Sequence, residues 1–212
     1  MNAETQSERL FQEFCRLYRI SCERLTPTGR RTPDFVVDFG GTEVICEVKQ
    51  IDPNKEDGSE LAELPHDADA GRIVPNRLRA KLKKISPQLK SASQRGRPTL
   101  LVVYDHTPFK GYTLHTDVVE AMFGRNSVIV RMPTDPSLPP QISRLFFGGD
   151  RGMGPGRNTA VSALAILDDR LQPPLTLRVY HNPYAAVRLD PRAFASLPVT
   201  QPVLPDEPVV SL

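Results

Sequence analysis

The chain has 212 residues, 39% of them hydrophobic and 25% charged, and a net charge of +2. These values are ordinary for a soluble protein and allow one sizeable domain, or one domain with an appended lobe. Apolar runs stay well short of the roughly 18 residues of a membrane-spanning helix, and the polar N-terminus lacks a signal-peptide core. We therefore expect a cytoplasmic protein with no membrane partner.

Residues 4–19 are predicted to form the first helix, because Leu10, Phe11, Phe14, Leu17 and Tyr18 recur at intervals of three and four residues. A short strand is expected over residues 21–25. The three cysteines, at positions 15, 22 and 46, have no CxxC spacing and no nearby histidine. Such sparse usage fits a reducing compartment and argues against a disulfide framework and against a structural zinc site.

A β-hairpin is predicted next, with arms at residues 34–39 and 42–49 around Gly40-Gly41. Two glycines can adopt the positive φ angles of a tight hairpin turn. If this pair forms a two-residue turn, facing positions sum to 81, so Asp34 lies opposite Glu47. Alternation along the strand then puts Lys49 on the face of Glu47.

The charge of the middle segment is divided into two opposed blocks. Residues 52–69 hold seven acids and one lysine, a local net charge of −6, and are predicted to form a loop. Residues 72–97 hold nine Lys or Arg and no acid. A basic helix is predicted over residues 76–85, and Ser86-Pro87 resembles an N-cap and first-turn proline that would begin a second helical piece at 88–93.

An unbroken apolar run at residues 97–105 predicts a buried central strand. Further strands are expected over residues 127–132, 159–167 and 175–182. The last residues are rich in proline and predict an extended tail. The resulting organisation is an α/β core over residues 1–110, a C-terminal β-rich extension packed on the same domain over 111–190, and a tail over 191–212.

The hairpin carries the strongest chemical signal. Two carboxylates placed face to face destabilise a sheet unless a cation offsets their repulsion. Magnesium prefers oxygen ligands and leaves positions for water and phosphate oxygens, while a lysine can orient or deprotonate a water. Asp34, Glu47 and Lys49 therefore predict metal-assisted hydrolysis of a phosphodiester.

The motif formed by Pro33, Asp34, Glu47 and Lys49 resembles that of the PD-(D/E)XK nuclease superfamily. The predicted order of elements over residues 4–105 is similar to the α-β-β-β-α-β core of this restriction-endonuclease-like fold, including Holliday-junction resolvases. The resemblance implies a magnesium- or manganese-dependent nuclease, with endonuclease action on DNA as the favoured activity, while action on RNA and exonuclease action stay open. It also implies metal binding by Asp34, Glu47 and the carbonyl group of Val48, with Lys49 positioning the attacking water.

Members of this superfamily often add a glutamate from the first helix. The stretch ERLFQEFCRLYRI, residues 8–20, is similar to the resolvase pattern and places Glu8 at that position. It departs from the pattern because Arg19 stands where a glycine usually falls. Glu13 therefore remains a rival for the role of helix carboxylate.

Competing interpretations accompany each signal. The hairpin charges could form a solvated salt bridge, although the residues around them are apolar on both faces. The basic helix predicts contact with a nucleic-acid backbone, or a soluble helix face only.

Cutting both strands of a duplex would favour a homodimer. The alternative function is a nuclease-fold module that binds nucleic acid or a protein without cutting. The scattered histidines are interpreted as structural. The expected nucleic-acid contacts are Arg77, Arg79, Lys81, Lys83 and Lys84.

Overall fold

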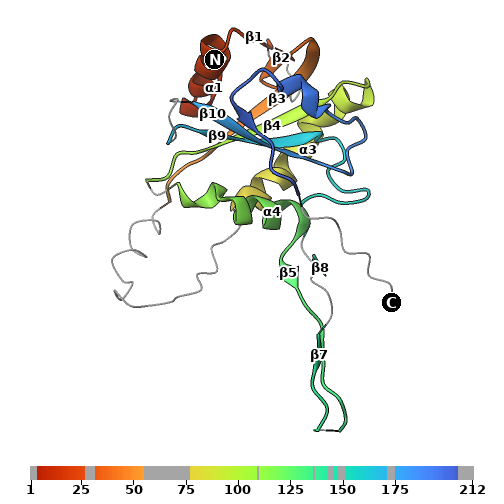
Figure 1. Ribbon diagram of the computed structural model, residues 1–212. Coiled ribbons are helices and arrows are strands. Elements are labelled where there is room, and N and C mark those ends of the chain that lie inside the picture. Colours follow the sequence, from red (N-terminus) through yellow and green to blue (C-terminus); the bar gives the residue numbers. More distant parts are fainter. Residues whose placement is uncertain are drawn as a thin grey trace.

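The computed structural model describes residues 4–26, 32–54, 77–108, 110–135, 137–142, 146–147, 151–170 and 175–204. Its centre is a mixed sheet of seven strands in the order β1-β2-β3-β4-β9-β10-β11, with helices on both faces (Figure 1). The neighbouring strands β3, β4 and β9 are parallel to one another. The predicted α/β class is confirmed. The elements that build the sheet and its covering layers are α1 (Gln6–Leu17), β1 (Ser21–Arg24), β2 (Phe35–Phe39), β3 (Thr42–Ile51), α3 (Arg77–Gln94), β4 (Thr99–Asp105), η1 (Gly111–Thr113), α4 (His115–Phe123), β9 (Ala163–Asp168), β10 (Thr176–His181), η2 (Pro191–Phe194) and β11 (Val199–Thr200).

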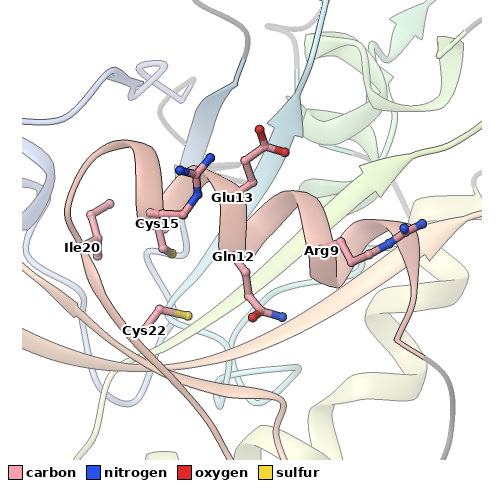
Figure 2. Close-up of a pocket in the computed structure, with 7 residues that line it drawn as sticks. Arg9, Gln12, Glu13, Cys15, Ile20 and Cys22 are labelled. Carbon is pink, nitrogen blue, oxygen red and sulfur yellow. The ribbon is translucent and has the colours of Figure 1, made fainter.

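Helix α1 begins with a capping box. The side chain of Thr5 accepts a hydrogen bond from the backbone N–H of Glu8, and the Glu8 carboxylate accepts one from the backbone N–H of Thr5. The helix buries Phe11, Phe14 and Cys15 against the sheet. A hollow remains between the outer side of α1 and the start of β1 (Figure 2).

The turn between β2 and β3 has the predicted geometry. Gly40 and Gly41 have φ angles of +59° and +85°, as a two-residue turn with a left-handed backbone requires. Phe39 pairs with Thr42 and Phe35 pairs with Cys46, so facing positions sum to 81. The register predicted from the sequence is confirmed between the turn and the pair Phe35–Cys46.

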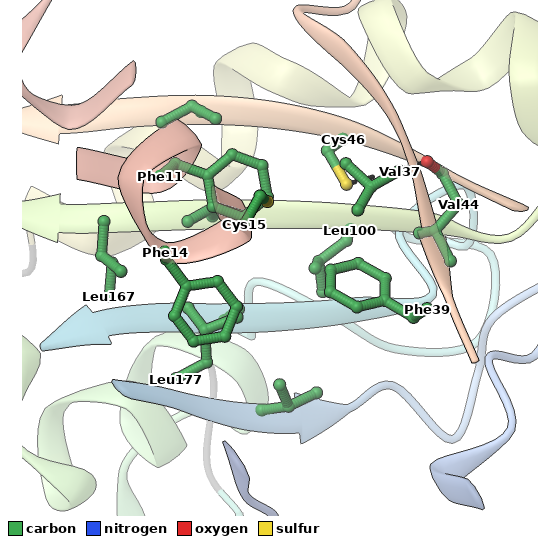
Figure 3. Packing of buried hydrophobic residues seen from close by; sticks show 14 of the residues in the cluster. Phe11, Phe14, Cys15, Val37, Phe39, Val44, Cys46, Leu100, Leu167 and Leu177 are labelled. Atoms are coloured by element: carbon green, nitrogen blue, oxygen red, sulfur yellow. Dashed lines mark hydrogen bonds between the residues drawn. The ribbon is translucent and has the colours of Figure 1, made fainter. Parts of the chain in front are cut away.

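The sheet separates two apolar layers. The face under α1 packs residues such as Phe11, Phe14, Val37, Leu100 and Leu177 into one cluster (Figure 3). The opposite face packs side chains of β4 and β9 against α3 and α4. Central strands buried on both faces explain the unbroken apolar run of β4.

The predicted order of helix, three strands, helix and strand is confirmed over residues 6–105. The predicted break at Ser86-Pro87 is wrong, because α3 continues from Arg77 to Gln94. Leu82 and Leu89, on either side of the proline, are fully buried against the sheet. This packing holds both halves of the helix in place despite the missing N–H donor of the proline. The acidic loop predicted for residues 52–69 lies outside the described residues from position 55 onward.

The C-terminal half differs from its prediction in two ways. It contains α4, which the sequence interpretation did not assign, and it places β9 directly beside β4 in the sheet.

Residues 191–194, predicted as part of the tail, form the short helix η2, whose Phe194 ring lies 4.9 Å from the ring of Phe39. Proline fits the first turn of such a helix, where its missing N–H would have no partner.

A narrow arm projects from the layers between α4 and β9 (Figure 1). Its base pairs β5 (Asn126–Ser127) with β8 (Phe146–Phe147), and its outer part pairs β6 (Val130–Arg131) with β7 (Gln141–Ile142). Exposed on it are Val128, Ile129, Val130, Met132, Leu138 and Ile142. The predicted strand at 127–132 is therefore two short pieces of this arm.

Candidate metal centre

The candidate site lies where β2 ends and β3 continues. The last paired residues of the hairpin are Phe35 and Cys46. The backbone N–H of Asp34 donates to the carbonyl of Cys46 at 3.1 Å, and these positions sum to 80, so the predicted register of 81 does not continue to Asp34. Glu47 and Lys49 lie on the same face of β3, because they are two residues apart on the strand. Lys49 Nζ forms an ion pair with Glu47 Oε1 and lies 3.9 Å from Asp34 Oδ2.

The side chain of Glu47 is fully buried. Neither of its oxygens accepts a well-formed hydrogen bond from the residues that the structure describes. Burial, together with the charge of Asp34, raises the pKa of Glu47 to about 7, although Lys49 partly opposes the shift. This burial contradicts the interpretation of the charged group as a solvated salt bridge, because an unsatisfied carboxylate in the interior is costly.

Asp34 is half-buried and its Oδ2 accepts a hydrogen bond of 2.8 Å from the backbone N–H of Val48. Burial raises the pKa of Asp34, while the Val48 amide and the charge of Lys49 act in the opposite direction. Two carboxylates and one ammonium group thus share the site. The group carries a net negative charge when both carboxylates are ionised, and a cation would remove the remaining repulsion.

The carbonyl group of Val48 points toward the side of β3 on which β2 lies. The carbonyl of Cys46 accepts from Asp34 on the β2 side, and residues two apart on a strand direct their backbone groups toward the same neighbour. The carbonyl of Val48 is therefore directed to the side on which β2 has ended. This direction agrees with its implied role as a metal ligand.

The oxygen atoms of Asp34, Glu47 and the Val48 carbonyl suit magnesium and would fill part of its coordination sphere. Magnesium is commonly held by one or two carboxylates and keeps several positions for water and phosphate oxygens. Within the described part of the chain, there is no group of three or more His, Cys, Asp or Glu arranged to hold a metal. Asp34, Glu47 and the Val48 carbonyl would thus be completed by water and substrate, and the burial of the Glu47 carboxylate near the charge of Asp34 is the observation that favours this fit.

The structure separates the two candidate helix carboxylates. The charge of Glu8 contributes to the raised pKa of Asp34, so this residue lies beside the site. Glu13 is exposed and lines the hollow between α1 and β1 instead (Figure 2). Glu8 is, however, already engaged by the Thr5 amide and by Arg24 Nη2 at 3.0 Å.

Gln50, the polar residue that follows the motif lysine, and His106, which the sequence analysis interpreted as structural, contact each other near the end of β3. Gln50 accepts a hydrogen bond of 2.9 Å from the backbone N–H of Ser7, which ties the start of α1 to β3. Its amide nitrogen lies 3.2 Å from His106 Nδ1. His106 directly follows β4, and parallel strands end at the same edge of a sheet. That rule is the signal that could have placed this histidine near the site.

The basic residues of α3 that were predicted to contact nucleic acid differ in their exposure and in their partners. Arg79 is half-buried and donates to the carbonyl of Glu120 in α4, so it does not lie on the surface predicted for it. Arg77 stacks over the ring of Tyr112 at 4.7 Å. Burial lowers the pKa of Lys81, and the positive charges of Lys49, Lys84 and Arg77 lower it further while Asp52 opposes them. Lys81 is half-buried, whereas the side chains of Lys83 and Lys84 are exposed.

Comparisons with known proteins give no relative for this arrangement. No family model, curated protein or solved structure matches the chain. Among the helices of the described residues, none is long and apolar enough to cross a bilayer.

Proposed function

We propose that the chain is a magnesium-dependent endonuclease that hydrolyses phosphodiester bonds of DNA, built on a restriction-endonuclease-like core. The observation that carries the proposal is the fully buried Glu47 carboxylate, which forms an ion pair with Lys49, while Lys49 also lies 3.9 Å from the second carboxylate, Asp34. A buried acid pair with one lysine is costly for stability alone, and this cost is a common feature of functional sites.

Asp34 and Glu47 would hold the metal together with the carbonyl of Val48. When bound, magnesium would supply a Lewis acid for the phosphate and lower the pKa of a coordinated water. Lys49 is a donor without acceptor capacity, so it would orient the attacking water and neutralise charge on the phosphate. Binding of the metal at the carboxylates would release the Lys49 ammonium from its ion pairs for this task.

The surface of α3 supports a polyanionic substrate. Lys81, Lys83 and Lys84 lie on the helix that covers the same face of the sheet as Lys49. Contacts between lysines and phosphate groups position a protein on the duplex without selecting a base sequence. We expect them to position the backbone rather than to read the sequence.

The proposal is tested by cleavage assays on a panel of DNA and RNA substrates with and without Mg²⁺ or Mn²⁺. Asp34→Ala and Lys49→Ala should each lower metal-dependent cleavage by at least about 10²-fold, because each removes a group that acts at the reacting phosphate. Glu43→Ala is the matched control. It removes an exposed carboxylate of the same hairpin, which pairs with Arg97 at the turn end, and should leave the rate unchanged. Undiminished cleavage by both Asp34→Ala and Lys49→Ala would end the assignment.

The alternative is a module that binds nucleic acid or a protein partner without cutting. The engagement of Glu8 by Thr5 and Arg24 favours it, because this carboxylate is then not directed to a metal. Isothermal titration with Mn²⁺ separates the two. If the chain is an endonuclease, the wild-type protein should bind the ion and Asp34→Ala should not. A non-cutting module need bind no ion at this position.

A further inference from the structure

Two cysteines that are distant from any sequence motif meet in the fold. Cys15 lies in the last turns of α1 and Cys22 is the second residue of β1. Both line the hollow of about 600 Å³ between these elements. Figure 2 shows their sulfur atoms directed toward each other across it.

The short connection from α1 to β1 sets this geometry. The backbone N–H of Ile20 donates to the carbonyl of Cys15 at 2.8 Å, and Arg19 adopts a φ of +55°. This closed turn reverses the chain within a few residues. Cys22 then faces back toward α1, on the sheet face that packs beneath the helix.

The surroundings of Cys22 are those of a reactive thiol. The neighbouring Cys15 thiol lowers the pKa of Cys22, although the partial burial of Cys22 acts in the opposite direction. Arg9 and Arg16 line the same hollow, with Glu13 as the acidic neighbour. Reactive cysteines occur in such partly exposed and electropositive surroundings, whereas buried cysteines in apolar surroundings are inert.

We propose that Cys15 and Cys22 form a reversible oxidation site that closes to an intramolecular disulfide in the presence of a hydroperoxide. The Cys22 thiolate attacks the peroxide oxygen, the O–O bond breaks, and a sulfenic acid forms while water or an alcohol leaves. The Cys15 sulfur then attacks the Cys22 sulfur, its proton passes to the departing hydroxyl, and a second water leaves. The two thiols lose two electrons in total and the peroxide gains them.

Disulfide formation needs only local movement. The sulfur atoms must approach from hydrogen-bond contact to a bond length of about 2.05 Å. Cys22 is half-buried and adjoins the hollow, so its side chain has room to rotate. The bond would join α1 to β1 covalently, and a disulfide reductase or a small thiol would reverse it.

Cys46 provides an internal comparison. It lies in β3 on the same sheet face, but it is fully buried and does not line the hollow. A thiol in this position is shielded from a dissolved oxidant. We expect it to stay reduced under conditions that oxidise the pair.

The experiment treats the full-length protein with hydrogen peroxide, alkylates the remaining thiols after denaturation, and digests it with trypsin. Cleavage after Arg16 and Arg19 separates the two cysteines into the peptides LFQEFCR and ISCER. The expected product is these two peptides joined, lighter by two hydrogen atoms and separated again by a reducing agent. Cys46 should be recovered alkylated.

Cys22→Ser and Cys15→Ser are the test variants, and Cys46→Ser is the matched control. The joined peptides should be absent from both test variants and present in the control, with circular dichroism spectra that show all three folded. A sulfenic acid trapped by dimedone on Cys22 in the Cys15→Ser variant would support the order of attack. Joined peptides that contain Cys46, disulfides between two chains, or a pair that survives peroxide in the thiol form would overturn the proposal. Since the readout is a mass, it is independent of nuclease activity.

Discussion

The end of β3 and the projecting arm depart in opposite directions from the usual distribution of side chains. At the end of β3 the side chain of Glu47 has 0% exposure, beside Asp34 and Lys49. On the arm, Met132 is 74% exposed and Ile142 is 69% exposed. Buried charges and exposed apolar surface both carry a cost for an isolated domain.

The two regions differ in what holds them in place. The site is surrounded by strands and helices whose apolar packing fixes the position of its charged groups. The arm contacts the domain at its base, where the ring of Phe147 lies 5.4 Å from that of Phe123. A costly arrangement at the site therefore requires support from the whole core, whereas the outer arm contributes little to the stability of the domain.

The largest expected effect on the free energy of unfolding concerns the apolar core that supports the site. Phe39 is fully buried and its ring packs against Phe194. Replacement by alanine should lower the free energy of unfolding by about 3–5 kcal/mol, since it removes a large side chain and leaves a cavity. Urea denaturation followed by circular dichroism measures the change. A loss below about 1 kcal/mol would show that this part of the core is loosely packed.

The next effect concerns the pH dependence of stability. Glu47 has a pKa near 7 in the folded chain, above the ordinary value of 4.5 that the unfolded chain should retain. Between these two values the unfolded chain releases its proton first, so the folded state becomes less stable as the pH rises. In a chelator, stability should fall by about 3 kcal/mol from pH 5 to pH 8 because of this group.

Glu47→Gln removes that titration. The variant should show a flatter stability profile between pH 5 and pH 8 than the wild type, as measured by urea denaturation in EDTA. Addition of Mg²⁺ at pH 8 should stabilise the wild type and leave the variant unchanged. Parallel profiles for the two proteins would contradict the assigned pKa of Glu47.

A smaller effect is expected at the basic helix. In the Asp34→Ala background, which should bind DNA without cutting it, Lys81→Ala and Lys84→Ala should each reduce the slope of log affinity against log salt by about 1. Lys90→Ala is the control, because nine residues after Lys81 place it on the opposite side of α3. Equal slopes for all three variants would exclude this face of the helix from DNA binding. Fluorescence anisotropy at several salt concentrations provides the measurement.

The smallest effect is expected on the arm. Met132→Ser should change the free energy of unfolding by less than about 0.5 kcal/mol, since the side chain packs on little in the described structure. Urea denaturation alongside Phe39→Ala gives the contrast directly. A loss comparable to that of a core residue would show that the arm is covered in solution.

Several elements could be predicted because their signals are local. The apolar spacing of α1, the glycine pair of the hairpin and the unbroken apolar run of β4 each depend on residues close together in sequence. Helix α4 was missed because it is short and no start signal marks it: its N-cap residue is Leu114, whose side chain makes no capping hydrogen bond.

The site, too, could be predicted only where its signals are local in the sequence. A tight turn fixes a register, and this register holds as far as Phe35 and Cys46, the residues next to Asp34 and Glu47. The structure brings the two carboxylates to the same lysine, Lys49, although the register itself does not continue to Asp34. The sequence could not show that Glu8 would be engaged by Arg24, or that Gln50 would bind the first turn of α1. These contacts join segments that are distant in the chain.

The sequence by itself determined the α/β class, the hairpin register and the identity of the charged group, since short-range periodicity and turn geometry specify them. Only the tertiary structure decided that Glu47 is fully buried and ion-paired with Lys49, and that Cys15 and Cys22 line one hollow. It also decided that β9 lies beside β4. Burial and long-range contacts depend on how the layers pack around the sheet, and that packing is a property of all the described elements together.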